Sequence, residues 1–284
     1  MIRLPGGRLA AETPRQAARL AAGGGWFLGP WARRICRTGR SGDRLGLHRL
    51  EQRWGAAVSD FLDIDWDLTG LDFIVTGRRS ILLPLHEGFA DALAVLRLGR
   101  QVGFVARDEL FEWPTLGRYL RDTDQVLIDP ASGRAAYRHL LEAGGEVLDR
   151  GEALVVFPQG SILGIEVAFW PGAFQLAERL DAWIVPVVLT GSHRVWEYPY
   201  SPLVRFGQRM SVRVLPPLPP GEAVDGAREL EAEMKRIALA GSMAPPRRFR
   251  PDVDGYWDDY GYEIDPAFPD LAAQVASHRE QLGR

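Results

Sequence analysis

Short apolar runs that alternate with helix-length amphipathic segments dominate the middle of this chain. Each run is bounded by turn residues, which predicts a buried strand, and the segments between the runs carry apolar residues at helical spacing. This rhythm predicts an α/β fold with a mixed, mostly parallel sheet wrapped by helices. The expected strands are residues 64–71, 81–85, 101–106, 125–128, 153–157, 183–189 and 211–215.

The clearest predicted helix covers residues 46–62, where apolar residues recur at intervals of three and four. Its apolar stripe is expected to pack on the sheet. A second helix is expected over residues 132–148, with Ser132 as its N-cap. The stiff segment Pro216–Pro220 is interpreted as a linker into a charged helix at residues 226–239. Shorter helices are expected to begin near Asp91, Pro114 and Pro171.

The composition predicts a folded protein without disulfides or a metal site. The chain has 284 residues, 46% of them hydrophobic, which is ample for a sizeable core. Cys36 is the only cysteine, and the five histidines show no metal-ligand spacing. A reducing, cytoplasmic setting is expected. No apolar run approaches the ~18 residues that span a bilayer, and no secretory signal is recognised, so a soluble or peripheral protein is expected.

Charge is distributed unevenly along the chain. Residues 1–50 contain ten arginines against two acidic residues, although the net charge of the whole chain is −3. Aromatic and aliphatic residues interleave with these arginines between Trp26 and Ile35. Two interpretations stay open: residues 1–45 lie on an anionic membrane surface such as the inner face of the cell membrane, or they form a solvated face docked on the acidic body. The glycines at residues 23–25 interrupt the apolar face.

These patterns divide the chain into three predicted regions. Residues 1–62 form a basic, helical N-terminal region, and residues 63–243 form an α/β domain. Residues 244–284 form a tail in which acidic and aromatic residues are mixed. This tail either clasps a basic surface such as the N-terminal region or is only partly ordered.

A histidine and an acid follow the predicted strand 81–85. His86 and Asp91 are five residues apart, so within one helix their side chains would lie on different faces. His86 is therefore expected in a strand end or tight turn relaxed by Gly88, with Asp91 in the first helical turn reaching back. An imidazole oriented by a carboxylate is a general base for a hydroxyl. The alternative is a histidine capped by chance at a strand end.

A second candidate lies where the predicted strand 153–157 runs into a glycine turn. Ligands of open α/β sheets bind at strand ends. A backbone N–H of Gly160 or Ser161 is a candidate donor to an oxyanion, and Gln159 is a candidate contact to an acceptor. A plain strand-to-loop turn is the alternative.

Taken together, four stretches resemble the conserved blocks of the lysophospholipid acyltransferase superfamily, whose members include 1-acylglycerol-3-phosphate acyltransferases. Leu-His-Glu-Gly-Phe-Ala-Asp at 85–91 resembles the Asn-His-x4-Asp block. Val-Ala-Arg-Asp-Glu-Leu at 105–110 resembles the second block, and Phe-Pro-Gln-Gly-Ser at 157–161 resembles the third. Phe-Trp-Pro-Gly-Ala at 169–173, followed by Ile-Val-Pro-Val, resembles the fourth. The resemblance covers roughly residues 60–215.

The resemblance implies direct acyl transfer from a thioester of coenzyme A or acyl carrier protein to a lipid hydroxyl. His86 would deprotonate that hydroxyl, and Asp91 would orient His86. The third block, Gln159 to Ser161, would help to hold the acceptor. No cofactor is expected apart from the donor substrate, and the expected partners are the donor, the lipid acceptor and a membrane surface, with no nucleic acid.

Departures from the family pattern fall on acceptor binding. Leu85 replaces an asparagine, Gln159 replaces a glutamate, and Ile162 and Pro130 stand where arginines are expected. Losing charge-assisted bonds of ~1.5–3 kcal/mol each should weaken binding of a phosphomonoester. The acceptor is left open between lysophosphatidate and another lyso-lipid or alcohol, and Ile162 and Pro130 lead us to expect a preference for non-phosphorylated acceptors. Arginines that could replace the missing ones are Arg107, Arg134 and Arg194.

Two other functions are weighed against acyl transfer. A serine hydrolase would use Ser161 as nucleophile, but Gly-Ser-x-x-Gly does not match the Gly-x-Ser-x-Gly of a nucleophile elbow. A catalytically weak lipid-binding module of the same fold is the other alternative. His193 is a further possible base, but we expect no carboxylate near it and assign it a structural role.

Overall fold

The computed structural model describes most of the chain up to residue 242. The described residues are 2–4, 7–160, 162, 168–196, 203–242 and three single positions, 273, 276 and 280. The predicted acidic tail, residues 244–284, lies outside these residues apart from the three single positions. Ser161 also lies outside them.

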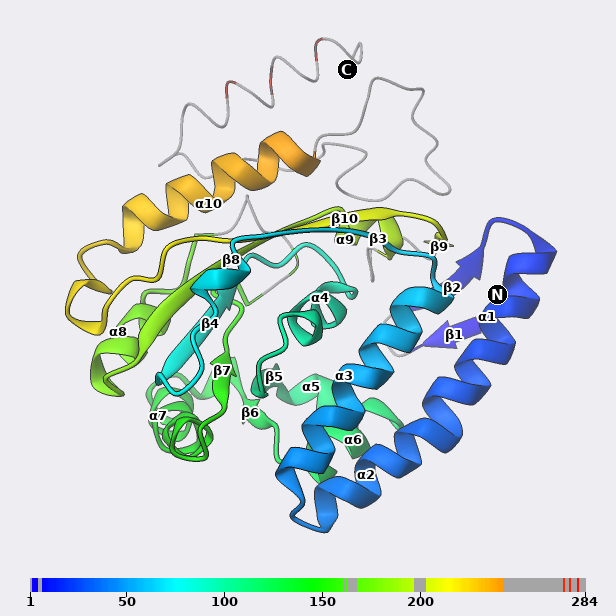
Figure 1. Ribbon diagram of the computed structural model, residues 1–284, viewed down its shortest axis with the longest axis horizontal. Helices are drawn as coiled ribbons and strands as arrows, with labels where there is room; N and C mark the ends of the chain where they lie inside the picture. The colour runs from blue at the N-terminus through cyan, green and yellow to red at the C-terminus, as the bar shows by residue number, and fades with distance from the viewer. Residues whose placement is uncertain are drawn as a thin grey trace.

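Seven strands of the described chain form the main sheet, in the order β3-β10-β8-β4-β7-β5-β6 (Figure 1). Neighbouring strands run parallel except for the antiparallel pair β8 and β10. The predicted class, a mixed and mostly parallel sheet, is confirmed. The strands are β3 (Asp65–Thr69), β4 (Ser80–Pro84), β5 (Val102–Arg107), β6 (Val126–Ile128), β7 (Ala153–Val155), β8 (Trp183–Thr190) and β10 (Arg209–Val214).

Helices cover both faces of this sheet, which explains why its central strands are apolar throughout. In β4, Ile81 and Leu83 point into the core formed with α7 (Arg134–Asp149), α8 (Pro171–Arg179) and α10 (Ala227–Ser242). Leu82 points to the opposite core, formed with α4 (Asp91–Arg97). Successive strand residues face opposite sides of a sheet, so a strand buried on both sides reads as a continuous apolar run. Figure 1 shows α10 and α4 on opposite sides of the strands.

The predicted helix over residues 46–62 is α3 (Arg44–Phe61), with Asp43 accepting the Gly46 N–H at its N-terminus. It packs against α4 and α2 (Ala32–Arg40), and α4 separates much of it from the sheet (Figure 1). Trp54, Val58 and Phe61 of its stripe nevertheless pack against the core cluster that contains strand residues of the sheet, so the expectation that the stripe packs on the sheet is confirmed. The buried face of α3 also contains His48 and Glu51, which are polar positions within the stripe.

The N-terminal region begins with a small second sheet that periodicity did not predict. Its order is β1-β2-β9, with bounds Ile2–Leu4, Gly7–Ala11 and Leu203–Val204. Helix α1 (Pro14–Trp26) continues through a π-helical turn, Phe27–Trp31, into α2. The glycines at 23–25 do not end α1. A Cβ at Gly23 would lie 2.3 Å from the Phe61 ring, so glycine there lets α1 approach α3 closely.

One local prediction is corrected by the structure. Helix α7 begins at Arg134 after Gly133, and the Ser132 hydroxyl bonds to Asp129 instead of capping the helix. The proline-rich segment connects β10 to α10 as expected, and within it Leu218 exchanges two backbone hydrogen bonds of 2.9 Å with Ile184 at the start of β8. No helix of the described residues is both long and apolar enough to cross a membrane. The remaining helices are α5 (Asp108–Phe111), α6 (Leu116–Asp122) and α9 (Ser192–Val195).

Candidate active site

His86 stands just beyond the end of β4, in the loop that leads into α4. Every residue of β4 is buried, and the Leu85 N–H donates to the Val187 carbonyl at 2.9 Å. The strand therefore fixes where the loop begins. Asp91 is the first residue of α4 and is buried. The structure thus has the predicted arrangement, a histidine at a strand end facing an acid in the first helical turn.

A short hydrogen bond joins the His86 imidazole to the Asp91 carboxylate. His86 Nδ1 lies 2.5 Å from Asp91 Oδ2. The same oxygen accepts the backbone N–H groups of Glu87 at 2.7 Å and Gly88 at 3.0 Å. A carboxylate that accepts from the imidazole in this position holds the ring proton on Nδ1. Nε2 then carries the lone pair that a general base needs.

The ring of Phe157 supports the His86 imidazole from one side. The two rings stack with their centroids 4.2 Å apart and their planes 30° apart. Phe157 follows β7, which pairs in parallel with β4, so both side chains emerge at the same edge of the sheet. Sequence reasoning assigned Phe157 no role, since only the pairing of β4 with β7 brings the two rings together.

A cavity of about 1360 Å³ opens at this edge of the sheet. His86 lines it together with Arg107, Gln159 and Gly160, all of which were predicted for the site. Asp91 lies behind His86, as its buried hydrogen bonds require. Pockets for drug-sized ligands measure roughly 300–1,000 Å³, so this cavity has room for a long chain as well as a headgroup.

A backbone hydrogen bond closes the turn after β7. The Gly160 N–H donates to the Phe157 carbonyl at 3.1 Å, and Gly160 has a positive φ of 65°. Its N–H is therefore occupied, which does not fit the expectation that it serves an oxyanion. Arg107 reaches the same turn from the end of β5, where its NH1 donates to the Gly160 carbonyl at 3.4 Å and its Nε lies 3.0 Å from Glu109 Oε1.

Three exposed arginines line the cavity: Arg107, Arg134 and Arg138. The last two come from the first two turns of α7. Of the candidates for replacing the family's missing arginines, Arg107 and Arg134 therefore face the cavity, whereas Arg194 is not among its lining residues. Arg138 was not predicted, although its spacing of four from Arg134 places both on one face of a helix.

The wall that the N-terminal helices contribute is largely apolar. Phe27, Leu28, Ile35 and Trp54 line the cavity from the π-helical turn, α2 and α3. Helices α4 and α6 complete this wall with Leu93, Leu96, Leu116 and Leu120. The N-terminal helices are therefore part of the cavity wall, which their sequence alone did not indicate.

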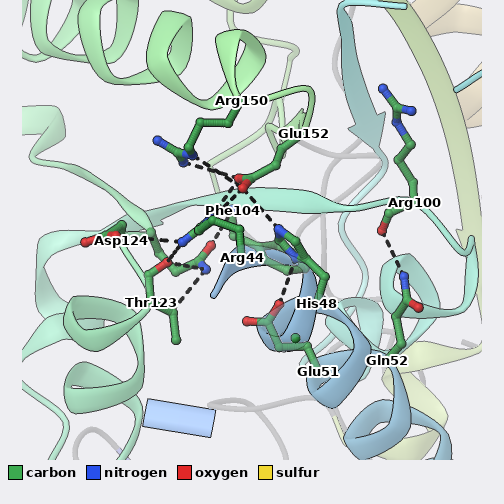
Figure 2. A network of polar contacts seen from close by, with 12 residues as sticks. Arg44, His48, Glu51, Gln52, Arg100, Phe104, Thr123, Asp124, Arg150 and Glu152 are labelled. Atoms are coloured by element: carbon green, nitrogen blue, oxygen red, sulfur yellow. Dashed lines mark hydrogen bonds and ion pairs between the residues drawn. The ribbon is translucent and has the colours of Figure 1, made fainter. Parts of the chain in front are cut away.

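A buried polar network fixes α3 to the body of the protein. Arg44 donates to both oxygens of Glu152 at 2.8 Å, and His48 Nε2 lies 3.1 Å from Glu152 Oε1. His48 Nδ1 lies 3.1 Å from Glu51 Oε2, and Glu51 Oε1 accepts the Tyr119 hydroxyl at 2.8 Å. Figure 2 shows His48 between the two carboxylates. Because Glu51 and Tyr119 also line the cavity, the network anchors one of its walls.

The network shifts the pKa values of its members in opposite directions. Burial raises the pKa of Glu152, but hydrogen bonds from His48, Arg44 and Arg150 outweigh it and lower the pKa to about 2. Burial lowers the pKa of His48, yet its hydrogen bonds to Glu152 and Glu51 raise the pKa overall. His48 is thus favoured in its charged form between the side chains of Glu152 and Glu51.

The prediction that His193 has no carboxylate near it is wrong. His193 Nδ1 lies 3.0 Å from Glu87 Oε2, and both residues are buried. The acid was missed because it precedes His193 by 106 residues and belongs to the loop after β4. Strands β4 and β8 are neighbours in the sheet, so the segments that follow them meet.

Comparison with known proteins identifies a family match over the residues that contain this site. Residues 65–190 match the protein family described as Acyltransferase. These residues form a domain of the lysophospholipid acyltransferase superfamily. The matched residues begin at β3 and end at β8, and they include His86, Asp91 and the turn after β7.

Three curated relatives of the acyltransferase domain are 1-acyl-sn-glycerol-3-phosphate acyltransferases. The enzyme of Limnanthes alba is 31% identical over 125 residues, which cover 43% of this chain and 44% of the relative. The enzyme of Helicobacter pylori is 32% identical over 43% of this chain and 52% of its own. The enzyme of Chlamydomonas reinhardtii is 26% identical over 71% of this chain and 60% of its own. The chain spans about half the length of these relatives.

A solved structure shares the fold over a longer stretch. The crystal structure of the 1-acyl-sn-glycerophosphate acyltransferase PlsC from Thermotoga maritima matches with a TM-score of 0.56 and 20% sequence identity. The match covers 71% of this chain and 80% of that one. Among the residues described here, no group of three or more His, Cys, Asp or Glu side chains is arranged to hold a metal ion.

Proposed function

We propose that this protein transfers a fatty acyl group from an acyl thioester, carried by coenzyme A or acyl carrier protein, to the hydroxyl of a lyso-lipid. The observation that carries the proposal is the His86–Asp91 pair, with 2.5 Å between Nδ1 and Oδ2, at the mouth of a cavity of about 1360 Å³. The activity for which the relatives are named, acyl transfer to 1-acyl-sn-glycerol-3-phosphate, supports the reaction class.

In the proposed mechanism, His86 Nε2 accepts the proton of the acceptor hydroxyl while the hydroxyl oxygen attacks the thioester carbonyl carbon. This step forms the new C–O bond and a tetrahedral intermediate. Collapse of the intermediate breaks the C–S bond, and the imidazolium returns the proton to the departing thiolate. Asp91 stabilises the imidazolium without taking its proton. The apolar wall from the N-terminal helices and α4 would receive the acyl chain, because it removes methylene groups from water.

The test is to incubate the purified protein with acyl-CoA or acyl carrier protein and a panel of acceptors, and to identify products by mass. His86→Ala is expected to lower turnover by roughly 10²–10⁴-fold, the usual contribution of a general base. His139, which is exposed on α7 and does not line the cavity, provides the control variant His139→Ala. Unchanged turnover in His86→Ala would exclude His86 as the base.

The acceptor class that the cavity favours is a phosphomonoester such as lysophosphatidate. Arg107, Arg134 and Arg138 line the cavity, and Glu51 is the one carboxylate among its described lining residues. Glu51 is already bonded to His48 and Tyr119. The surplus positive charge would attract a dianionic headgroup, and each charge-assisted bond contributes about 1.5–3 kcal/mol. The arginines of α7 would then replace those that are missing in the second and third blocks.

Arg134→Gln and Arg138→Gln test this choice of acceptor. Each is expected to raise KM for lysophosphatidate by about tenfold or more while leaving KM for monoacylglycerol unchanged, since the latter has no phosphate. Arg213→Gln, an exposed arginine on β10 away from the cavity lining, is the matched control. A wild-type preference for monoacylglycerol would instead support the expectation drawn from Ile162 and Pro130, and equal effects on both acceptors would exclude a phosphate site.

The N-terminal helices are proposed to contact a membrane surface. Trp26 and Leu28 are 57% and 56% exposed, and Leu28 also lines the cavity. Exposed arginines follow in α2, at Arg33, Arg34 and Arg37. Aromatic and aliphatic side chains beside arginines suit an interface with anionic headgroups. A lipid acceptor could then enter the cavity directly from the bilayer.

A further inference from the structure

A second buried carboxylate–imidazole pair lies directly behind the His86–Asp91 pair. Glu87 follows His86 in the chain, and its carboxylate points toward the turn after β8. Its Oε2 accepts the backbone N–H groups of Gly191 at 2.7 Å and Ser192 at 3.1 Å, and lies 3.0 Å from His193 Nδ1. Both Glu87 and His193 are buried.

Glu87 makes hydrogen bonds both to the turn after β8 and to Asp91. While its side chain binds the turn after β8, its backbone N–H donates to Asp91 Oδ2 at 2.7 Å. Asp91 Oδ2 is the oxygen that lies 2.5 Å from His86 Nδ1. A displacement of Glu87 would therefore shift a hydrogen bond of the proposed catalytic carboxylate as well as the residue next to the base.

The remainder of the loop is packed against the same turn. A Cβ at Gly88 would lie 2.8 Å from Ser192 Oγ and 3.0 Å from the Ser192 carbonyl carbon, so the two backbones approach more closely than a side chain allows. The Phe89 N–H donates to the Trp196 carbonyl at 3.4 Å, and the two rings have centroids 5.0 Å apart. The loop thus rests along its length on α9 and the residues beside it.

We propose that Glu87 and His193 are positioning residues, which hold the loop that carries His86 in register with Asp91. Neither residue is among those that line the cavity, so the proposed role is to position His86 and not to bind substrate. A buried carboxylate is unfavourable unless it is hydrogen-bonded. The backbone N–H groups of Gly191 and Ser192, together with His193 Nδ1, supply these hydrogen bonds. The pair therefore ties the loop that carries the general base to the turn after β8.

This inference rests on the proposed function, because it assigns a second pair to the support of His86 as base. A misplacement of about 1 Å at a reacting group lowers turnover by about 100-fold. His193→Ala is accordingly expected to lower kcat by about 10–100-fold for the folded fraction, with KM for the acceptor nearly unchanged. His193→Asn keeps an N–H near the position of Nδ1 and is expected to restore kcat to within about threefold of wild type.

Three comparisons make the experiment decisive. His86→Ala is measured first, and activity equal to wild type in that variant would refute the proposed function itself. If His86→Ala is inactive while His193→Ala keeps wild-type kcat, the positioning role is refuted and the proposed function stands. Glu87→Gln, which is isosteric, decides the matter if His193→Ala does not fold: a fall in kcat of about tenfold supports the role, and wild-type kcat overturns it.

A spectroscopic readout separates positioning from general stability. The His86 Nδ1 proton is identified by NMR as the signal lost in His86→Ala. In His193→Ala this signal is expected to shift or broaden, because the hydrogen bond to Asp91 is no longer held at its original length. His139→Ala, with its exposed imidazole, should leave both the signal and kcat unchanged. A wild-type signal in folded His193→Ala would contradict the proposal.

Discussion

Replacing Glu152 with glutamine is expected to lower the free energy of unfolding by about 3 kcal/mol. The Glu152 side chain is 1% exposed and accepts from both Nε and NH2 of Arg44 at 2.8 Å. A pKa lowered from 4.5 to about 2 corresponds to about 3 kcal/mol in favour of the ionised form. Removing one partner of a buried ion pair costs about 3–5 kcal/mol, which agrees.

Glutamine cannot replace this carboxylate, because its amide offers one acceptor atom and adds two donors that would face Arg44, His48 and Arg150. The positive charges of Arg44, His48 and Arg150 would then face a neutral amide at a position where the side chain is 1% exposed. The control is Asp149→Asn, since Asp149 is 70% exposed in its ion pair with Arg79. An exposed pair contributes about 0–1 kcal/mol, so this variant should be close to wild type.

The stability difference between wild type and Glu152→Gln should depend on pH in two windows. The Glu152 pKa is lowered on folding, so its stabilisation is complete above pH 4.5 and is lost as the pH falls toward about 2. The His48 pKa is raised above 6.5, so its contribution is complete below pH 6.5 and is lost as the pH rises through the folded value. The difference should therefore be largest between about pH 5 and 6.

Urea unfolding followed by tryptophan fluorescence at pH 4, 5.5 and 8 measures these differences. A loss of about 3 kcal/mol lowers the thermal midpoint by about 6–12 °C, which differential scanning calorimetry can check. A Glu152→Gln protein within about 1 kcal/mol of wild type at pH 5.5 would refute the reasoning, because an exposed ion pair would do as much. So would a difference that stays constant from pH 8 to pH 4.

Three further predictions concern activity, membrane contact and packing. Ser161→Ala should leave acyl transfer substantially intact, whereas loss of activity with an acyl-Ser161 adduct in the wild type, seen by mass spectrometry, would indicate a hydrolase-like mechanism. Trp26→Ser combined with Leu28→Ser should reduce flotation with anionic liposomes; equal flotation would argue against an interfacial role. Gly39→Ala should destabilise the protein by about 1–3 kcal/mol in urea titrations, because its Cβ would lie 2.1 Å from the Asp122 carbonyl oxygen; wild-type stability would mean that α2 and α6 can separate freely.

Local patterns predicted the strands of the main sheet well because each buried strand is apolar over its own length. The continuous run at 81–85 became β4, buried on both faces between two layers of helices. The five-residue spacing of His86 and Asp91 predicted their geometry for a similar reason. A loop of four residues leaves few ways for the two side chains to meet, and the helix start supplies the acid.

Other features of the fold could not be predicted because their determinants are weak or distant. Strands β1, β2 and β9 are two to five residues long and carry no periodic signal. Ser132 is a good N-cap by type, yet the turn that begins at Asp129 engages its hydroxyl first. The division of the chain at residues 62 and 243, and the catalytic and binding roles assigned to the site, stay predictions.

The sequence by itself determined the fold class and the pairing of His86 with Asp91, since both follow from residues close together in the chain. Only the tertiary structure decided which distant groups meet. Glu87 and His193 are 106 residues apart, and Arg44 and Glu152 are 108 apart. A hydrogen bond requires atoms about 3 Å apart, and that proximity depends on strand order and helix packing. No local pattern records either of them.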